Sequence, residues 1–340
     1  MNKNKKSILT LFTTWAACCL AVISTSCSMD PVAPTDETKN KLHEDPSRMT
    51  ITLVESHLHA DWKEIQEIGG LHQNPESPAK HLKRIQKITY EVQPGKGWGL
   101  AEGSPDKFYV LQNGEYRHGD AFTPAPVYLL LIQYFNAEGK LINGQLCEDG
   151  QDLIHQHFFS PVNVQPTADG KVEQDDTDPS KMFDYLYADT DPWNHTHHED
   201  HAEITGDKNP IGLKGVIRFL KDRKQFDLNI RLYHGYSSKI NPQTGHFDPF
   251  YKPSGILIQQ GTWDINVKVP VVVYMSKNDL IDIDENADPA SIPEDSLDKD
   301  SNRNVHSIMN AFHISWEEAL SDFIAYTFHA GDVESGHIYL

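Results

Sequence analysis

The sequence predicts a mainly β protein, built from antiparallel, sandwich-like sheets with a C-terminal helix. Several short runs alternate apolar and polar residues, or are rich in β-branched and aromatic side chains, as strands are. Gly- and Pro-containing connections separate these runs, and helical periodicity is confined to the end of the chain. No Gly-rich phosphate loop joins a strand to a helix and no strand–helix–strand alternation recurs, so a parallel α/β fold is not indicated.

The first 26 residues are typical of a secretory signal. A lysine-rich start precedes the apolar run 8–23, and the small residues 24–26 lead into Cys27. This pattern resembles the lipobox of bacterial lipoproteins, in the relaxed form of Bacteroidetes proteins. The resemblance implies that Cys27 is acylated and becomes the mature N-terminus, with the lipid bilayer as a partner. We therefore expect a lipid-anchored protein of the bacterial cell envelope, on the outer membrane.

Composition limits the partners of the chain. Asp and Glu number 49 against 30 Lys and Arg, which gives a formal net charge of −19. Nucleic acid is therefore excluded as an expected partner, because phosphate binding requires a basic face. Cys18 and Cys19 fall in the signal and Cys27 is the lipidation site, so Cys147 alone is left and no intramolecular disulfide is expected.

The elements follow in chain order. Residues 27–48 are polar and contain proline, which predicts a flexible tether. The strand-like runs are 49–60, 88–92, 108–111, 127–135, 154–159, 212–220, 226–234 and 261–274. They divide into a β-rich domain or half at 49–165 and another at 207–340, joined by an acidic, His-rich loop at 166–206, and two similar domains are one interpretation. Pro270 predicts that its strand is an edge strand or is bulged there.

The last sixty residues combine an acidic loop and helix. Residues 276–304 are strongly acidic. Within them the run Asp282–Asp288 is similar to the start of a calcium loop, but Ala287 replaces the required glycine and Pro293 replaces the closing glutamate, so a flexible acidic loop is predicted. Residues 304–312 are compatible with helix. Ser315 and Glu318 form a capping-box pattern that opens a helix at 316–328, whose apolar face should pack on the sheet.

Histidines supply the candidate functional site. Four lie in the tract Trp193–His201, together with Glu199 and Asp200, and a helix capped by Asp191 would place His197 and His201 on one face. Two His-x-His pairs lie in predicted strands, where alternation points both members to one face. The candidate ligands are His57, His59, His155, His157, His195, His197, His198, His201 and His234.

Imidazole without cysteine favours coordination by nitrogen and carboxylate. The expected metal is zinc, followed by copper, nickel or iron. We therefore predict an envelope lipoprotein that captures a transition metal for uptake, with an outer-membrane transporter as a candidate partner. Binding should weaken as the pH falls through about 6, because protons compete for the ligands.

Three alternatives are left open. Haem could use histidines as axial ligands. A surface glycan-binding module would rest on Trp62, Trp98, Trp193 and Trp263. A metal-dependent hydrolase could combine His57, His59 and a distant aspartate with Glu199 as base. The protease motif His-Glu-x-x-His is one residue short at 198–201, so we assign no catalytic residue and expect a binding protein rather than an enzyme.

Overall fold

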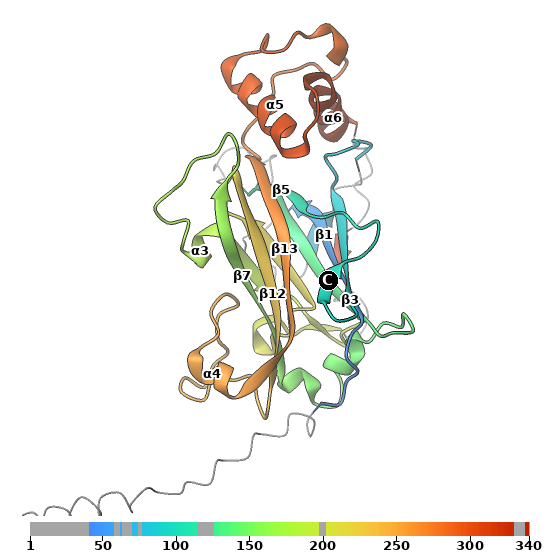
Figure 1. The fold of residues 1–340 in the computed structure, drawn as a ribbon, viewed down its shortest axis with the longest axis vertical. Coiled ribbons are helices and arrows are strands. Elements are labelled where there is room, and N and C mark those ends of the chain that lie inside the picture. The colour runs from blue at the N-terminus through green and yellow to red at the C-terminus, as the bar shows by residue number, and fades with distance from the viewer. Residues whose placement is uncertain are drawn as a thin grey trace, which may run out of the picture. The chain divides into compact units, whose positions relative to one another are not determined.

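The computed structural model describes residues 41–57, 62, 77–113, 126–196 and 202–329, and the backbone of 70–73 and 337–339. They belong to one compact unit, Asn40–Leu340, which is mainly β with helices at its C-terminal end, as predicted (Figure 1). The strands are β1 Arg48–His57, β2 Gly70–Gln73, β3 Ile85–Gln93, β4 Gly97–Leu100, β5 Phe108–Gln112, β6 Pro126–Phe135, β7 His155–Pro166, β8 Phe183–Tyr187, β9 Thr190–Asp191, β10 Glu203–Ile204, β11 Lys214–Phe219, β12 Lys224–Gly235, β13 Gly261–Ser276 and β14 His337–Tyr339. The helices are α3 Pro179–Met182, α4 Gly255–Gln259, α5 Lys299–Phe312 and α6 Trp316–Phe328, with short 3₁₀ turns η3 Asn143–Leu146, η4 Gln151–Leu153, η5 Gly206–Lys208 and η6 Pro289–Ser291.

Twelve strands form one sheet, and β9 and β10 form a small second one. The main order is β14-β2-β1-β6-β11-β5-β13-β12-β7, with β3, β4 and β8 attached beside it. Most pairs are antiparallel, but β5 runs parallel to both β11 and β13, so the sheet is mixed rather than antiparallel throughout. Both halves of the sequence contribute strands to this one sheet, and the described residues contain no second similar domain.

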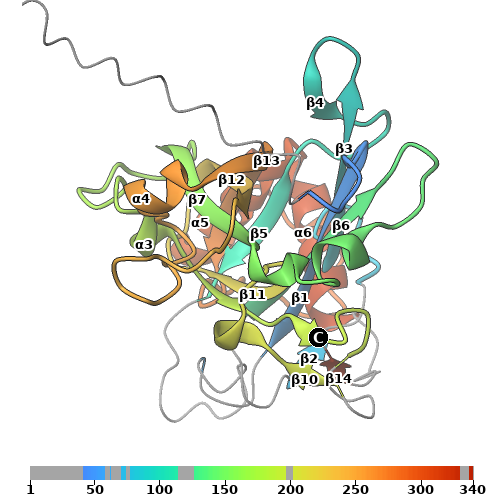
Figure 2. The same cartoon turned by 90° about the horizontal axis from the view of Figure 1, so that it is seen from below.

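Alternation along the strands builds the main hydrophobic core. Ile51 and Leu53 of β1 are fully buried, and they belong to the same cluster as Leu228 and Ile230 of β12. Each such side chain contributes roughly 1.5–3 kcal/mol when it leaves water. Figure 2 separates the two parts of the sheet, with β1, β3 and β6 on one side and β7, β12 and β13 on the other. The sheet is therefore folded so that both parts face a common core.

The segment predicted to be a connecting loop, 166–206, contains structure. It includes α3 and strand β8, which pairs with β11 and turns Phe183, Tyr185 and Tyr187 into the core. Asp189 follows β8, and its buried carboxylate accepts hydrogen bonds from the four backbone N–H groups of 211–214 at 2.7–3.1 Å. Strand β8 was not predicted, because the acidic stretch before it made the whole segment resemble a loop. The helix predicted from Asp191 does not form at its start, where 192–195 is a turn.

Strand β13 departs from the expectation based on Pro270. That residue pairs with Asp227 of β12 without a break, and it immediately precedes the stretch that pairs with β5. The irregularities of β13 lie elsewhere, opposite Leu232/Tyr233 of β12 and between Val273 and Met275. Pro270 therefore marks the point where β13 gains its second neighbour rather than a bulge.

The C-terminal helices pack on one end of the sheet. Helix α6 begins with the predicted capping box, in which Ser315 and Glu318 bond each other's backbone N–H groups. Its buried Trp316 and Leu320 cluster with Tyr274 of β13, so the predicted packing of this helix is confirmed. Helix α5 begins at Lys299, earlier than the predicted 304, because Asp298 caps it by accepting from two backbone N–H groups.

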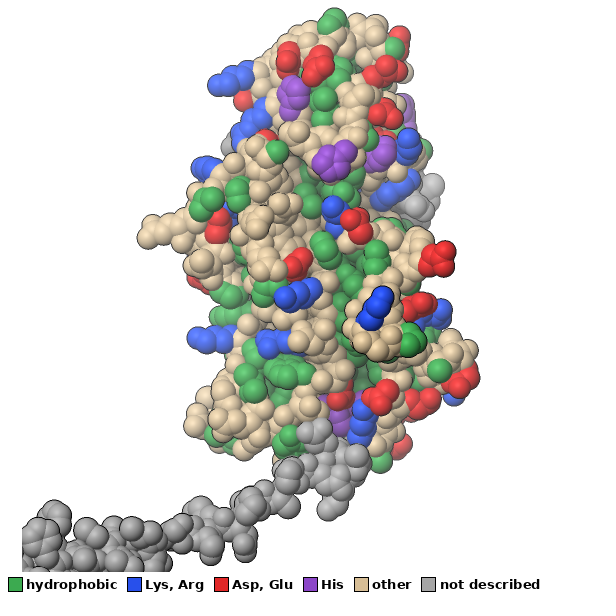
Figure 3. Space-filling view, in the orientation of Figure 1, with side chains coloured by type: hydrophobic (Ala, Val, Ile, Leu, Met, Phe, Trp, Pro, Cys, Tyr) green, Lys and Arg blue, Asp and Glu red, His purple; other side chains and the backbone are tan. Residues whose placement is uncertain are grey.

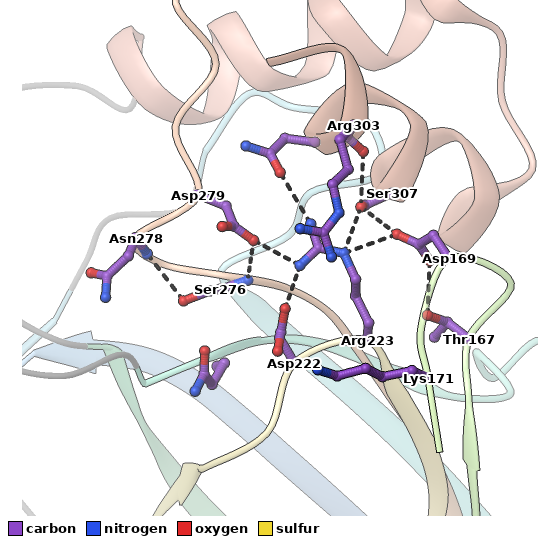
Figure 4. A network of polar contacts seen from close by, with 12 residues as sticks. Thr167, Asp169, Lys171, Asp222, Arg223, Ser276, Asn278, Asp279, Arg303 and Ser307 are labelled. Carbon is purple, nitrogen blue, oxygen red and sulfur yellow. Dashed lines mark hydrogen bonds and ion pairs between the residues drawn. The ribbon is translucent and has the colours of Figure 1, made fainter. Parts of the chain in front are cut away.

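A buried arginine ties α5 to the loops at this end of the sheet (Figure 4). Arg223 lies between β11 and β12 and is 3% exposed. Its guanidinium donates to Asp169 at 3.0 Å and to Asp279 at 2.9 Å, and it also contacts Asp222. On α5 it donates to Asn304 at 3.0 Å and to Ser307 at 3.2 Å. One side chain therefore joins three loops and a helix.

Candidate metal centre

Strands β7 and β12 bring two histidines together at one end of the folded sheet. His155, the first residue of β7, is the register partner of His234 near the end of β12. Their ring centroids are 4.5 Å apart, and the two residues are 0% and 3% exposed. Directly opposed residues of an antiparallel pair have adjacent side chains, so this contact follows from the register.

A β-bulge supplies the carboxylate. In the β12/β13 ladder Leu232 pairs with Ile265 and Tyr233 pairs with Trp263, which leaves Asp264 as the extra residue of β13. Bulges redirect side chains. In a regular strand Asp264 would point away from the core side, because its neighbour Ile265 points to the core. At the bulge Asp264 instead reaches the two histidines. The Asp264 side chain is 8% exposed.

The fourth member comes from outside the sheet. His43 belongs to the segment 41–47, called here the N-terminal strap, which leads into β1 in the opposite part of the sheet. His43 is the one buried residue of this strap. Next to it, Glu44 exchanges two 2.8 Å hydrogen bonds with Gln145 and accepts a third from Asn136 at 3.0 Å. These contacts place the His43 ring against the β7 and β12 histidines.

The four side chains present their ligand atoms to one point. Asp264 Oδ2 lies 3.0 Å from His234 Nδ1, 3.1 Å from His43 Nε2 and 3.7 Å from His155 Nε2. His43 Nε2 is 3.2 Å from His155 Nε2 and 3.5 Å from His234 Nδ1. Ligands of a tetrahedral zinc ion, bound at 2.0–2.1 Å, lie about 3.3–3.4 Å from one another. The measured separations bracket that value, so the group could hold a metal ion.

Hydrogen bonds fix which ring nitrogens face the centre. His155 Nδ1 lies 2.8 Å from the Gln151 carbonyl oxygen, and His43 Nδ1 lies 3.0 Å from that of Glu44. A carbonyl only accepts, so both Nδ1 atoms carry the proton and both Nε2 atoms of the neutral rings present lone pairs. Backbone carbonyls orient metal-binding histidines in this way.

These lone pairs require a positive charge between them. His43 Nε2 and His155 Nε2 face each other and also face the Asp264 carboxylate, an arrangement that repels when both rings are neutral. A proton on one ring relieves some of these contacts, whereas a cation at the centre satisfies all four ligand atoms. Burial alone would raise the pKa of the Asp264 carboxyl, but hydrogen bonds donated by His155, His234 and His43, in the forms that carry a proton on the nitrogen facing the carboxylate, hold that pKa well below its usual range. Burial also lowers the pKa of His155, which favours the neutral, metal-binding ring.

The predicted ligands separate into members and non-members of this group. His155 and His234 belong to it. His157 does not: its Nε2 lies 2.7 Å from the Tyr134 hydroxyl and its Nδ1 lies 2.8 Å from the Ile211 carbonyl. Both ring nitrogens are therefore used in the core, and burial lowers the pKa of His157 to about 4. The His155-x-His157 pattern marks one ligand and one buried structural histidine.

The remaining predicted residues lie elsewhere or outside the described residues. His57 ends β1, a ten-residue strand of about 30 Å, whereas the five residue-to-residue steps from His43 to Arg48 span at most about 18 Å, so His57 lies well away from His43 and is not part of the group. His195 lies in the turn after β9 and is not part of the group. The residues outside the described ranges are Cys27, His59, His197, His198, Glu199, Asp200 and His201.

Sequence reasoning missed His43 and Asp264. His43 stands in a polar stretch without periodicity, which predicted only a tether. Asp264 alternates with Trp263 and Ile265 and would face away from Ile265 in a regular strand. Only the bulge brings it to the histidines, and a bulge has no signal in this sequence.

Two other groups of acidic residues have different explanations. Lys221 and Lys224 neutralise Glu173, Asp175 and Asp176 through several ion pairs, so that group stabilises the loop after β7. Glu294, Asp295 and His306 lie on the surface near α5, where His306 Nε2 is 2.7 Å from Asp295. On the face in Figure 3, acidic and basic side chains are interspersed.

The tryptophans considered for glycan binding are dispersed. Trp62 lies under the Arg218 guanidinium, Trp263 lies under that of Arg231, and Trp98 packs against the core. Trp193 lines a groove of about 510 Å³ over the outer face of β1 and β6. A platform of several aromatic rings is therefore not assembled from these four residues.

Comparison with known proteins adds no relative. No protein-family model, curated protein or solved structure matches the chain. Within the described residues, none of the helices has the length and apolar character needed to span a bilayer.

Proposed function

We propose that this protein binds one zinc ion through His43, His155, His234 and Asp264. The observation that supports the proposal most directly is the set of ligand separations, 3.0–3.7 Å, which matches a tetrahedral ion. The oriented Nδ1 protons and the buried carboxylate support it further. Tetrahedral nitrogen and oxygen ligands without sulfur favour zinc over nickel or copper(II), which prefer tetragonal sites.

The same geometry argues against two alternatives. Haem leaves iron only two axial positions on opposite faces of the macrocycle, whereas this group supplies four converging ligand atoms within 4.8 Å of one another. A catalytic zinc usually keeps one position for water, and here the protein supplies all four ligands. The group therefore supports a binding role, and the proposed role is capture of zinc by an envelope protein.

The envelope assignment rests on the sequence alone. The lysine-rich start, the apolar run and Cys27 support export and acylation, and an outer-membrane transporter is the proposed partner that would receive zinc. Cys27→Ala should abolish incorporation of labelled palmitate and shift the protein from the membrane pellet to the soluble or unprocessed fraction. Unchanged membrane attachment of that variant would show that the lipid anchor is not at Cys27.

Direct titration tests the metal site. The metal-free protein without residues 1–26 is titrated with zinc, copper, nickel and haemin and followed by calorimetry and absorbance. We expect one tight zinc site, and cobalt in place of zinc should give the intense visible bands of tetrahedral Co²⁺. A variant with His197, His198 and His201 replaced by Ala should keep this site. Binding of all ligands only at millimolar concentration would exclude the proposed function.

A further inference from the structure

We infer that the N-terminal strap, residues 41–47, is the gate of the metal site: zinc first binds the three ligands on the sheet, and His43 then closes over it. This inference rests on the proposed function and adds how the site is loaded and emptied. The strap precedes β1 at the end of the molecule where β7, β12 and β13 carry the other ligands (Figures 1 and 2).

The ligands differ in how firmly the fold holds them. His155, His234 and Asp264 lie in three adjacent paired strands, within ladders that continue for many residues. His43 lies outside the strands, and the backbone pairing of its segment with β6 begins only at Ser47. Three ligands are therefore preorganised, whereas the fourth depends on how its segment is held.

Apolar contacts contribute little to holding the strap. His43 is its one buried residue, and the apolar Leu42 next to it is 64% exposed. Apart from the contacts of His43 itself, the strap is held to the rest of the described fold by the hydrogen bonds of Glu44 and Ser47, and the Lys41–Asp45 ion pair is internal to it. Exposed polar contacts of this kind stabilise a segment only weakly.

The presence or absence of the metal determines whether the docked His43 ring is attracted to the other three ligands or repelled by them. Its Nε2 lone pair faces the His155 Nε2 lone pair at 3.2 Å and the Asp264 carboxylate at 3.1 Å. A zinc ion converts these repulsions into coordination bonds. Binding of zinc and docking of the strap are therefore coupled, and each favours the other.

Entry of an ion into the closed site also requires that one segment of the chain be displaced. With the strap in place His43 is 8% exposed, His155 is 0% exposed and His234 is 3% exposed, so a hydrated ion cannot approach their lone pairs. Displacement of the strap uncovers the three sheet ligands without breaking any strand ladder. An open three-ligand site could accept zinc, or pass it to a competing ligand.

Hydrogen exchange measured by mass spectrometry tests the coupling. In the full-length chain, peptides covering 41–47 should exchange at least about tenfold more slowly with zinc than with chelator, while peptides from β12 should change little. In His43→Ala, zinc should bind more weakly and should no longer protect the strap. In His246→Ala, which alters an exposed histidine outside the group, the strap should behave as in the wild type.

A kinetic test uses a variant that keeps every ligand. Glu44→Ala removes the two hydrogen bonds that the Glu44 carboxylate accepts from Gln145 and Asn136, and keeps the backbone N–H bond to Gln145. Transfer of zinc to excess chelator should therefore be several-fold faster than in wild type. Glu148→Ala, at an exposed position of the neighbouring loop, should leave the rate unchanged. If zinc binds tightly but strap exchange is the same with and without it, the gate is refuted and the proposed function stands. If zinc does not bind at all, the proposed function itself fails.

Discussion

Zinc at a free concentration a thousandfold above its Kd should raise the free energy of unfolding by about 4 kcal/mol, and His155→Ala should lose nearly all of this gain. The gain arises because the folded chain brings His43 together with His155 and His234, 112 and 191 residues away in sequence, and with the still more distant Asp264, whereas the unfolded chain does not. His155 is the ligand to replace, because it is fully buried and its Nε2 faces both His43 and Asp264. Urea unfolding in buffered zinc and in chelator measures both gains.

The comparison uses the gain rather than the absolute stability. Removing a buried ring leaves a cavity that destabilises the folded state with or without zinc, so this cost cancels when the two conditions are subtracted. His246→Ala, at an exposed position, should retain the full gain. Equal gains in His155→Ala and wild type would place the zinc elsewhere, with the tract His195–His201 as the next site to examine.

Much of the fold follows from local patterns in the sequence. Runs such as 127–135 and 226–234 became β6 and β12, because alternation and β-branched content report directly on burial. The capping box at Ser315 predicted the start of α6 to the residue. The parallel pairing of β5 and the shared core were not predictable in this way, since they depend on contacts between distant segments that leave no periodic signal.

The candidate site likewise combines residues that local sequence patterns predicted with residues that only the tertiary structure reveals. His155 was found because the His-x-His spacing in a strand points both histidines to one face, but the same pattern also selected His157, which bonds Tyr134 and Ile211 instead. The tract that begins at His195 has the most closely spaced histidines of the sequence, but none of its described residues belongs to the four-residue group. Asp264 depends on a bulge and His43 on the docking of a polar strap, and both are tertiary features.

Arg223→Met should lower the free energy of unfolding by about 3–5 kcal/mol, the cost typical of breaking a buried ion pair. The substitution removes the guanidinium that joins Asp169, Asp279 and α5, and it leaves those acceptors partly buried without this cation. The hydrogen bond from Ser307 of α5 to Asp169 remains. The backbone of Arg223 has a left-handed φ of 51°, which Met would also have to adopt, so backbone strain does not change. Urea unfolding of the two proteins, both in chelator, measures the difference without any contribution from metal.

Arg218→Met provides the matched control, because among the described residues Arg218 has one ion-pair partner, Asp184, besides its contact with the Trp62 ring, and its side chain is 29% exposed. Its loss should cost less than about 1 kcal/mol. Arg223→Lys should fall between the two, since lysine keeps the charge but cannot reach all five acceptors with one ammonium group. Hydrogen exchange should locate the damage in α5, which contributes Asn304 and Ser307 to the network, and leave β7 and β12 near the metal site protected. A loss for Arg223→Met no greater than that for Arg218→Met would show that water replaces the guanidinium, and that α6 and the apolar cluster around Trp316 suffice to hold the helices on the sheet.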